Sequence, residues 1–210
     1  MKKQPLDKRD LPVVILCGGQ GTRLREHTEY VPKPMVEIGE QPILWHIMKI
    51  YGSAGFERFV LCLGYKANTV KDFFLNYRPH AYSDCVVSGF GSKVDLIGKA
   101  EEDWRVTLID TGIWRNIGQR LWAVRHHVEG EDIFLANYSD GLSDVDLDDM
   151  VAKFKASGKL ACFLAVRPPL TYHLADIAND GRVERFRSSD RSEIWINGGY
   201  FIFRREIFDY

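Results

Sequence analysis

Short apolar runs alternate with longer amphipathic segments along this chain, and this alternation limits the possible folds more than any other feature. Residues 12–17, 58–64, 132–138 and 160–166 are rich in Val, Ile, Leu and Phe, with little alternation of polar and apolar side chains. Such runs are typical of strands in a parallel sheet that is covered on both faces. We therefore expect an α/β domain in which helices connect parallel strands.

The segments between these runs have the pattern of amphipathic helices. We expect helices over residues 43–55, 68–77, 117–129 and 146–158. The last of these begins with acidic residues and ends at Gly158, as the helix dipole and the C-cap preference for glycine favour. Strands that alternate with helices predict a Rossmann-like, doubly wound sheet.

Two regions interrupt this alternation. Residues 78–111 contain short β-like pieces, and residues 171–203 are β-rich. We expect these to be inserted strands that form one wall of a substrate cleft. Residues 204–210 have the pattern of the first turns of a helix. The sequence thus predicts a single domain over residues 1–210 that lacks a C-terminal segment.

The composition excludes several classes of protein. The net charge is −1, with both signs spread along the chain, which gives no reason to expect nucleic acid or an anionic membrane as partner. The four cysteines form no CxxC pair, so we expect buried, reduced thiols rather than disulfides or a zinc site. The N-terminus lacks the apolar core of a signal peptide, and the longest apolar run is too short to span a bilayer. We expect a soluble, cytoplasmic protein.

The first apolar run leads directly into the glycine-rich segment Gly18-Gly19-Gln20-Gly21. A loop of this kind at the carboxyl end of a strand exposes backbone N–H groups that can bind phosphate. It has neither the spacing of a Walker A loop nor that of a dinucleotide-binding loop. Taken alone, the glycines are equally consistent with a tight turn between a strand and a helix.

Two cations near this loop favour the phosphate-binding interpretation. Arg23 follows the glycines, and Lys33 lies between two prolines on a segment that is expected to be stiff and extended. Two positive charges beside such a loop suit a polyphosphate whose leaving group gains negative charge. The histidines show no metal-ligand spacing, and no Ser–His–Asp or Cys–His set stands out.

The segments GGQGTRL and PKPMVEIG resemble the signature of the sugar-nucleotide pyrophosphorylases. The stretches CLGYKANTVKDFF, VTLIDTG, NYSDG and INGGYF are most similar to the glucose-1-phosphate cytidylyltransferase branch of that family. The likeness extends from Leu11 to Phe208. It implies the nucleotide-diphospho-sugar transferase fold, a mixed sheet with the inserted strands on the sugar side of the cleft. It also implies transfer of a nucleotidyl group from CTP to a sugar 1-phosphate, such as glucose 1-phosphate, giving a CDP-sugar and pyrophosphate.

The resemblance further implies a Mg²⁺ cofactor, a possible homo-oligomer and a place in polysaccharide biosynthesis. It assigns catalytic charge stabilisation to Arg23 and Lys33, and the metal to Asp140, for which a plain Asp-Gly turn is the alternative. Nucleotide-binding residues by the same resemblance are Leu16, Gly18, Gly19, Gly21, Thr22, Asp110, Thr111 and Gly112. Gln119 and Arg120 fall where the family has a glycine-containing turn into a helix. Sugar-binding residues are Asn197 and Gly198, for which a turn at a strand edge is the alternative.

The chain departs from the family pattern at three places on the sugar side. Ser189 stands where the family has a lysine that binds the sugar phosphate, and Arg187 or Arg191 is the candidate to supply that charge. Tyr172 and His173 replace smaller residues, and the family's second metal-binding aspartate lies beyond the end of this chain. The alternative function is therefore a nucleotide- or nucleotide-sugar-binding protein that is catalytically impaired and serves as a regulatory module or scaffold.

Overall fold

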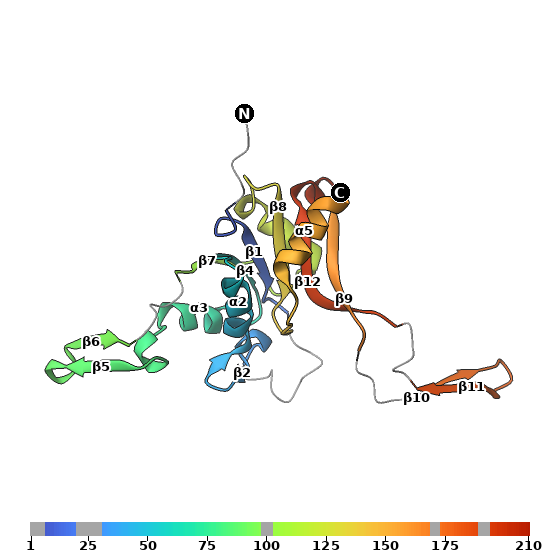
Figure 1. Ribbon diagram of the computed structural model, residues 1–210, viewed down its shortest axis with the longest axis horizontal. Helices are drawn as coiled ribbons and strands as arrows, with labels where there is room; N and C mark the ends of the chain where they lie inside the picture. Colours follow the sequence, from blue (N-terminus) through green and yellow to red (C-terminus); the bar gives the residue numbers. More distant parts are fainter. Residues whose placement is uncertain (1–6, 20–30, 98–102, 169–172, 189–193) are drawn as a thin grey trace.

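The computed structural model describes residues 7–19, 31–97, 103–168, 173–188 and 194–210. Within these residues the largest sheet has the strand order β7-β4-β1-β8-β12-β9. Its strands are β1 (Pro12–Leu16), β4 (Arg58–Leu63), β7 (Arg105–Asp110), β8 (Ile133–Tyr138), β9 (Ala161–Val166) and β12 (Ile196–Arg204). Figure 1 shows this sheet at the centre of the molecule, with helices packed around it. The expected α/β architecture with a mixed sheet is confirmed.

Strand β1, which forms from the first apolar run, is covered on both faces of the sheet. It pairs in parallel with β4 on one edge and with β8 on the other. The side chains of Val13 and Ile15 belong to one core cluster, while Val14 belongs to a second cluster on the other face. All three are fully buried. A strand that is covered on both faces requires apolar residues at every position.

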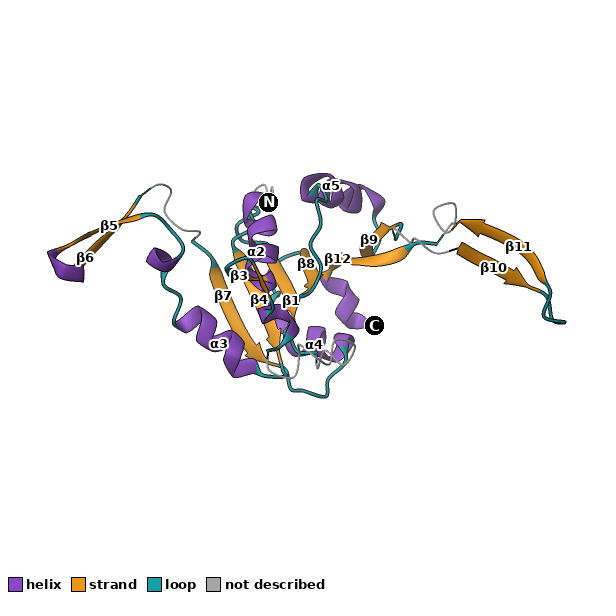
Figure 2. Cartoon of the chain, turned by 90° about the horizontal axis from the view of Figure 1, so that it is seen from below, coloured by secondary structure: helices purple, strands orange, loops and turns teal. Residues whose placement is uncertain are grey.

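Helices supply the cover on both faces. They are α2 (Ile43–Ser53), α3 (Ala67–Leu75), α4 (Ile117–Ala123) and α5 (Leu147–Ser157). Apolar residues of α2 and α5 join the core cluster of Val13, whereas Leu121 of α4 joins the cluster of Val14. Figure 2 shows α2 and α5 on one side of the sheet and α4 on the other. The sheet is thus doubly wound, as the alternation of strands and helices predicts.

The ends of α5 follow from the local sequence. The Asp146 side chain caps the helix by accepting a hydrogen bond from the Asp149 N–H at 2.9 Å. Gly158 ends the helix with φ of 64°, a left-handed conformation that costs glycine little. Asp148 and Asp149 lie in the first turn, where carboxylates interact favourably with the helix dipole.

Three strands differ from the sequence-based expectation. Residues 105–110 do not form an inserted piece, because β7 extends the central sheet as a parallel neighbour of β4. Strand β12 lies inside the central sheet and runs antiparallel to both β8 and β9. The run at residues 160–166, predicted as a parallel strand, therefore forms an antiparallel ladder at the sheet edge. An apolar run predicts a strand, but its direction and its neighbours depend on the tertiary fold.

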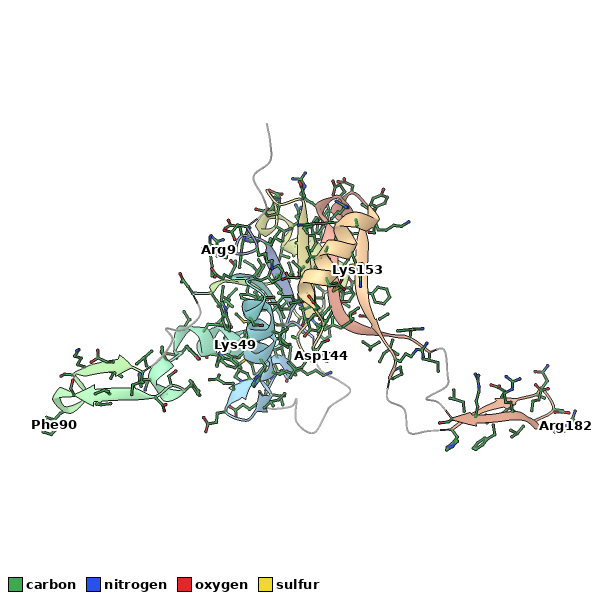
Figure 3. The ribbon with its side chains drawn as sticks, in the orientation of Figure 1. Arg9, Lys49, Phe90, Asp144, Lys153 and Arg182 are labelled. Atoms are coloured by element: carbon green, nitrogen blue, oxygen red, sulfur yellow. The ribbon has the colours of Figure 1, made fainter. Side chains whose placement is uncertain are left out.

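Two hairpins project from the body on opposite sides (Figures 1 and 3). The β5–β6 arm consists of β5 (Cys85–Ser88) and β6 (Lys93–Leu96), and the β10–β11 arm of β10 (His173–Ile177) and β11 (Val183–Ser188). Both are antiparallel two-stranded sheets. Figure 3 labels Phe90 at the tip of the first arm and Arg182 at the tip of the second. Where the sequence predicts inserted strands along a cleft, these two hairpins extend away from the central sheet.

The remaining described elements are short. They are β2 (Glu37–Ile38) and β3 (Gln41–Pro42), with the 3₁₀ helices η1 (Lys33–Met35), η2 (Pro79–Ala81), η3 (Gly89–Gly91), η4 (Arg125–His127) and η6 (Arg205–Asp209). Cys17 and Cys62 are buried free thiols, whereas Cys85 and Cys162 are partly exposed. No helix in the described part of the chain has the length and apolar character needed to cross a bilayer.

Candidate active site

A pocket of about 630 Å³ opens beside the carboxyl ends of β1 and β8 and the N-terminus of α4. In open α/β sheets, ligands bind outside the carboxyl ends of the strands, near the strand where the connections change direction. Strand β1 lies at that place, between β4 and β8. The residues that line the pocket are Leu16, Gly19, Ile113, Arg115, Asn116, Ile117, Gly118, Arg120 and Tyr138.

The described part of the glycine segment forms one wall of this pocket. Leu16 and Gly19 line it, and Gly19 is exposed, with no atom of the described residues beyond its chain neighbours within 4 Å of where a Cβ would stand. Gly18 lies against the guanidinium of Arg120, where a Cβ would come within 1.9 Å of Nη1. A side chain at position 18 would therefore displace the guanidinium. The predicted site residues Gly21, Thr22 and Arg23 lie outside the described residues.

The Arg120 side chain connects the end of β4 with the segments that follow β1 and β7 by hydrogen bonds. Its Nη1 donates hydrogen bonds to the Leu63 carbonyl at 3.1 Å and to the Thr111 hydroxyl at 2.6 Å. Its Nη2 donates to the carbonyls of Gly18 at 2.9 Å and Ile113 at 3.1 Å. The residue is 4% exposed, and burial lowers the pKa of its guanidinium below the ordinary value. These four hydrogen bonds hold the ends of β1, β4 and β7 in a fixed arrangement.

The predicted Asp110-Thr111-Gly112 segment reaches the same place, but its polar groups are engaged within the protein. The Asp110 carboxylate accepts a hydrogen bond from the Gly112 N–H at 2.9 Å. The buried Thr111 hydroxyl donates to the Leu63 carbonyl at 2.6 Å. Gly112 has φ of 88°, in the left-handed region that favours glycine. The segment therefore shapes the turn that leads from β7 to the pocket wall.

The wall after this turn is fixed by the start of α4. The Asn116 side chain accepts a hydrogen bond from the Gln119 N–H at 2.9 Å, and the Gln119 side chain accepts one from the Asn116 N–H at 3.0 Å. This reciprocal capping box satisfies two N–H groups at the helix end. Asn116, Ile117 and Gly118 are thereby held at the pocket surface.

Lys33 and Asp140, which are 107 residues apart in sequence, meet in the structure. Lys33 Nζ lies 3.2 Å from Asp140 Oδ2. Lys33 begins η1, between Pro32 and Pro34, and its side chain is 22% exposed, against 46% for Asp140. Next to Asp140, the Ser139 hydroxyl donates to the Leu16 carbonyl at 3.0 Å, which ties the turn after β8 to the end of β1. The predicted phosphate-binding lysine and metal-binding aspartate are thus neighbours.

The partial exposure of Asp140 leaves its carboxylate accessible to solvent. Mg²⁺ usually keeps several waters and binds through one or two carboxylates together with substrate phosphates. A single accessible carboxylate beside a lysine fits that mode of binding. Among the described residues, no cluster of three or more His, Cys, Asp or Glu side chains could hold a metal ion by itself.

Asn197 and Gly198 lie on β12, next to β8. The Asn197 amide donates to the Tyr138 hydroxyl at 3.4 Å, and its oxygen accepts from the Gly199 N–H at 2.8 Å. The pairing of β12 with β9 shifts register between Asn197 and Phe201, and Gly199 has φ of 83°. Bulges of this kind re-aim side chains next to active sites. Tyr138, which contacts Asn197, also lines the pocket.

Arg187 is not brought to the other predicted residues. It lies on the β10–β11 arm, where its Nη2 is 3.3 Å from Asp176 Oδ1. Figures 1 and 3 show this arm extending away from the central sheet. Ser189 and Arg191, the other residues named for this role, lie outside the described residues. The described structure therefore assigns no cation to the sugar phosphate.

Sequence reasoning named Leu16 and Gly19 as site residues, and it named Arg120 at the turn into a helix. It missed the other residues that line the pocket, which are Ile113, Arg115, Asn116, Ile117, Gly118 and Tyr138. The sequence signal for Arg115 was available, because it lies between the Asp110-Thr111-Gly112 segment and the predicted helix. No local signal shows that Arg120 holds the ends of the strands together, since its partners Leu63 and Gly18 are distant in sequence.

Known proteins resemble this chain over most of its length. A family model described as "Nucleotidyl transferase" matches residues 12–210. The chain is 40% identical over 200 residues to a glucose-1-phosphate cytidylyltransferase of Salmonella typhimurium, covering 95% of this chain and 77% of the relative. It is 35% identical, over the same shares, to a probable glucose-1-phosphate cytidylyltransferase of Bacillus subtilis.

A solved structure supports the fold as well. The crystal structure of HddC from Yersinia pseudotuberculosis, in complex with GMP-PN, matches with a TM-score of 0.63 and 25% identity, covering 95% of this chain and 80% of that one. The family match spans nearly the whole chain, and the 40% identical relative is covered over 77% of its length. The chain therefore belongs to the nucleotidyl transferase family, in the sugar-nucleotide pyrophosphorylase group that its sequence resembles.

Proposed function

We propose that this protein joins a sugar 1-phosphate to CTP, giving a CDP-sugar and pyrophosphate. The observation that carries the proposal is the pocket between the glycine segment and α4, together with the ion pair of Lys33 and Asp140. Lys33 begins η1, and Asp140 lies in the turn after β8. The relatives named as cytidylyltransferases favour CTP, and their names make glucose 1-phosphate the first sugar to test. Nothing among the described residues favours the alternative of an impaired binding protein.

The reaction requires positioning and charge stabilisation more than acid–base chemistry. A phosphate oxygen of the sugar attacks the α-phosphorus of the nucleotide, and pyrophosphate leaves from the opposite side. The attacking group is already an anion, so no general base is needed. In this proposal Lys33 stabilises the charge that develops on the α-phosphate, and Arg23, from the residues outside the described set, binds the leaving pyrophosphate.

Asp140 is the residue that would hold Mg²⁺. When bound with the nucleotide, the ion would neutralise phosphate charge and orient the phosphates. The 3.2 Å contact between Lys33 and Asp140 orients the two side chains toward each other before any ligand binds. We further propose that Lys33 turns from Asp140 to the nucleotide phosphate when the nucleotide and the metal bind.

The sugar side of the proposal rests on β12. Asn197 and Gly198 lie beside Tyr138, at the same edge of the sheet as the nucleotide pocket, and are proposed to face the sugar. Arg187 has no part in the proposal, because it pairs with Asp176 on the β10–β11 arm. A cytoplasmic location and a role in polysaccharide synthesis stay predictions from the resemblance.

A homo-oligomer is part of the proposal. Large apolar side chains are exposed on both arms, among them Val87, Phe90 and Phe186. Isolated two-stranded hairpins are marginally stable in water, so further copies of the chain would stabilise the arms by covering them. Sedimentation equilibrium tests this point, and a monomer at micromolar concentration would contradict it.

The experiment that tests the function measures pyrophosphate release with Mg²⁺, each common NTP and a panel of sugar 1-phosphates that includes glucose 1-phosphate. Release with CTP and at least one sugar is the expected result. If CTP binds by calorimetry but no pair releases pyrophosphate, the transferase proposal is wrong for this chain and the binding-protein alternative replaces it.

A further inference from the structure

Two arginines line the nucleotide pocket, and they differ in how many of their N–H groups are already hydrogen-bonded to the protein. Arg120 donates four hydrogen bonds to protein oxygens and is almost completely buried. Arg115 lines the same pocket, is exposed, and makes no hydrogen bond or ion pair with any residue that the structure describes. Of these two arginines, Arg115 is the one whose N–H groups are available to a ligand.

The position of Arg115 is set by rigid neighbours. Three residues before it, Gly112 has φ of 88°, and a Cβ on Gly112 would lie 3.9 Å from Arg115 Nε. The side chain thus folds back over the turn that follows β7. Directly after it, Asn116 begins the capping box of α4. Arg115 is held between two fixed points at the pocket surface.

The residues around Arg115 form a site that fits a planar ligand with polar edges. Ile113 and Ile117 line the pocket on either side of it, and both are partly exposed apolar residues. The end of β1 at Leu16 and the exposed Gly19 line the same pocket. Asn116 and Tyr138 add polar groups to the lining. Apolar walls with a few polar groups are typical of sites that bind a planar ligand and fix its orientation. A nucleobase has that shape and that chemistry.

A guanidinium carries only hydrogen-bond donors. The pairing edge of cytosine presents two adjacent acceptors, O2 and N3, which a guanidinium fork can engage together. Uracil has the same O2, but its N3 carries a hydrogen and is a donor. A guanidinium facing uracil at this edge would place two donors against each other, leaving one N–H group unpaired.

We infer that Arg115 is the residue that selects cytosine, by donating hydrogen bonds to O2 and N3 of the base. The inference rests on the proposed function and adds the residue that makes CTP the preferred nucleotide. It is a property of this pocket and does not follow from the fold, because a structural relative of the same fold was solved with a guanine nucleotide analogue.

The test compares kcat/KM for CTP and for UTP in the wild-type protein and in Arg115→Met, which keeps an unbranched apolar side chain and removes the donors. We expect the preference for CTP over UTP to fall by roughly ten- to a hundredfold, the range that one good bidentate contact to a base contributes. Most of the loss should fall on CTP. Arg115→Lys should restore only part of the preference, because an ammonium lacks the planar fork.

Arg125→Met is the matched control. Arg125 lies just after α4, over the ring of Trp122, and is not among the residues that line the pocket. The control should keep the wild-type preference, and the melting temperature of Arg115→Met should equal that of the wild type. Equal losses with CTP and UTP, or a wild-type protein that does not distinguish the two, would overturn the inference.

Calorimetric binding of CTP and UTP, without a sugar phosphate, separates this inference from the proposed function. If no pyrophosphate is released but wild type binds CTP more tightly than UTP and Arg115→Met does not, the transferase proposal fails and the inference stands. If the wild-type protein turns over CTP and Arg115→Met keeps its preference, the proposed function stands and the inference fails.

Discussion

Substituting Gly18 by alanine tests the central packing interaction of the site, that of the glycine segment on Arg120. The new Cβ would lie 1.9 Å from Nη1 and 2.4 Å from Cζ, whereas ordinary contact begins at 3.4 Å. The guanidinium would have to move by about 1.5 Å. Its hydrogen bonds of 2.6–3.1 Å would then exceed the range of a hydrogen bond.

The expected cost in stability follows from the hydrogen bonds of Arg120 that the displacement would break. Each net hydrogen bond contributes about 1 kcal/mol, and two to four of them would be broken, so we expect a cost of about 2–4 kcal/mol. For a chain of this size that corresponds to a fall in Tm of roughly 5–15 °C. The affinity for CTP should fall as well, because the glycine segment and α4 are no longer held together.

The assay is thermal and urea unfolding followed by circular dichroism. Gly19→Ala is the matched control, because a Cβ there comes within 4 Å of no described residue other than its chain neighbours, and its stability should change by less than about 1 kcal/mol. In an Arg120→Ala background the clash is gone, so Gly18→Ala should then be almost neutral. If the two substitutions lower the stability additively, the guanidinium is not what excludes a side chain at position 18, and the reasoning is refuted.

Three further predictions concern other parts of the molecule. Asp140→Asn should abolish the Mg²⁺ dependence of CTP binding in calorimetry, and unchanged metal dependence would exclude Asp140 as the ligand. Asn116→Ala removes the cap of α4 and should cost about 1 kcal/mol in urea unfolding, so an unchanged midpoint would argue against the capping box. Burial raises the pKa of the Cys62 thiol to about 12, so its stabilising effect is complete below the unfolded pKa of about 8.5 and is lost as the pH rises toward 12. Cys62→Val should therefore reduce the decline in unfolding free energy between pH 9 and 11 by up to about 1.4 kcal/mol per pH unit, and an equally steep decline in the variant would contradict this.

Local features of the sequence predicted much of the fold. The apolar run of β1 requires cover on both faces, and β1 is indeed buried on both. The acidic start of α5 and Gly158 define that helix because capping depends only on residues within a few positions. Strands that recur between helices are sufficient to predict a doubly wound sheet, since the connections between parallel strands must cross its faces.

The pairing partners of the strands, and the position of the two β-rich arms relative to the sheet, could not be predicted in this way. The run that forms β9 has the composition of a parallel strand, yet its ladder partner is the antiparallel β12. The β-rich segments of the two arms form hairpins that extend away from the central sheet in Figures 1 and 2. Pairing energies are similar for alternative neighbours, so long-range packing decides which strands meet.

The sequence by itself determined the elements and the chemistry available at the site. The glycine segment after β1, the lysine between two prolines and the aspartate after β8 are each recognisable from their own neighbours. Only the tertiary structure decided which of them meet. Gly18 and Arg120 are 102 residues apart, and Lys33 and Asp140 are 107 apart. The physical reason is that hydrogen bonds and steric exclusion act over a few ångströms in space, whatever the separation along the chain.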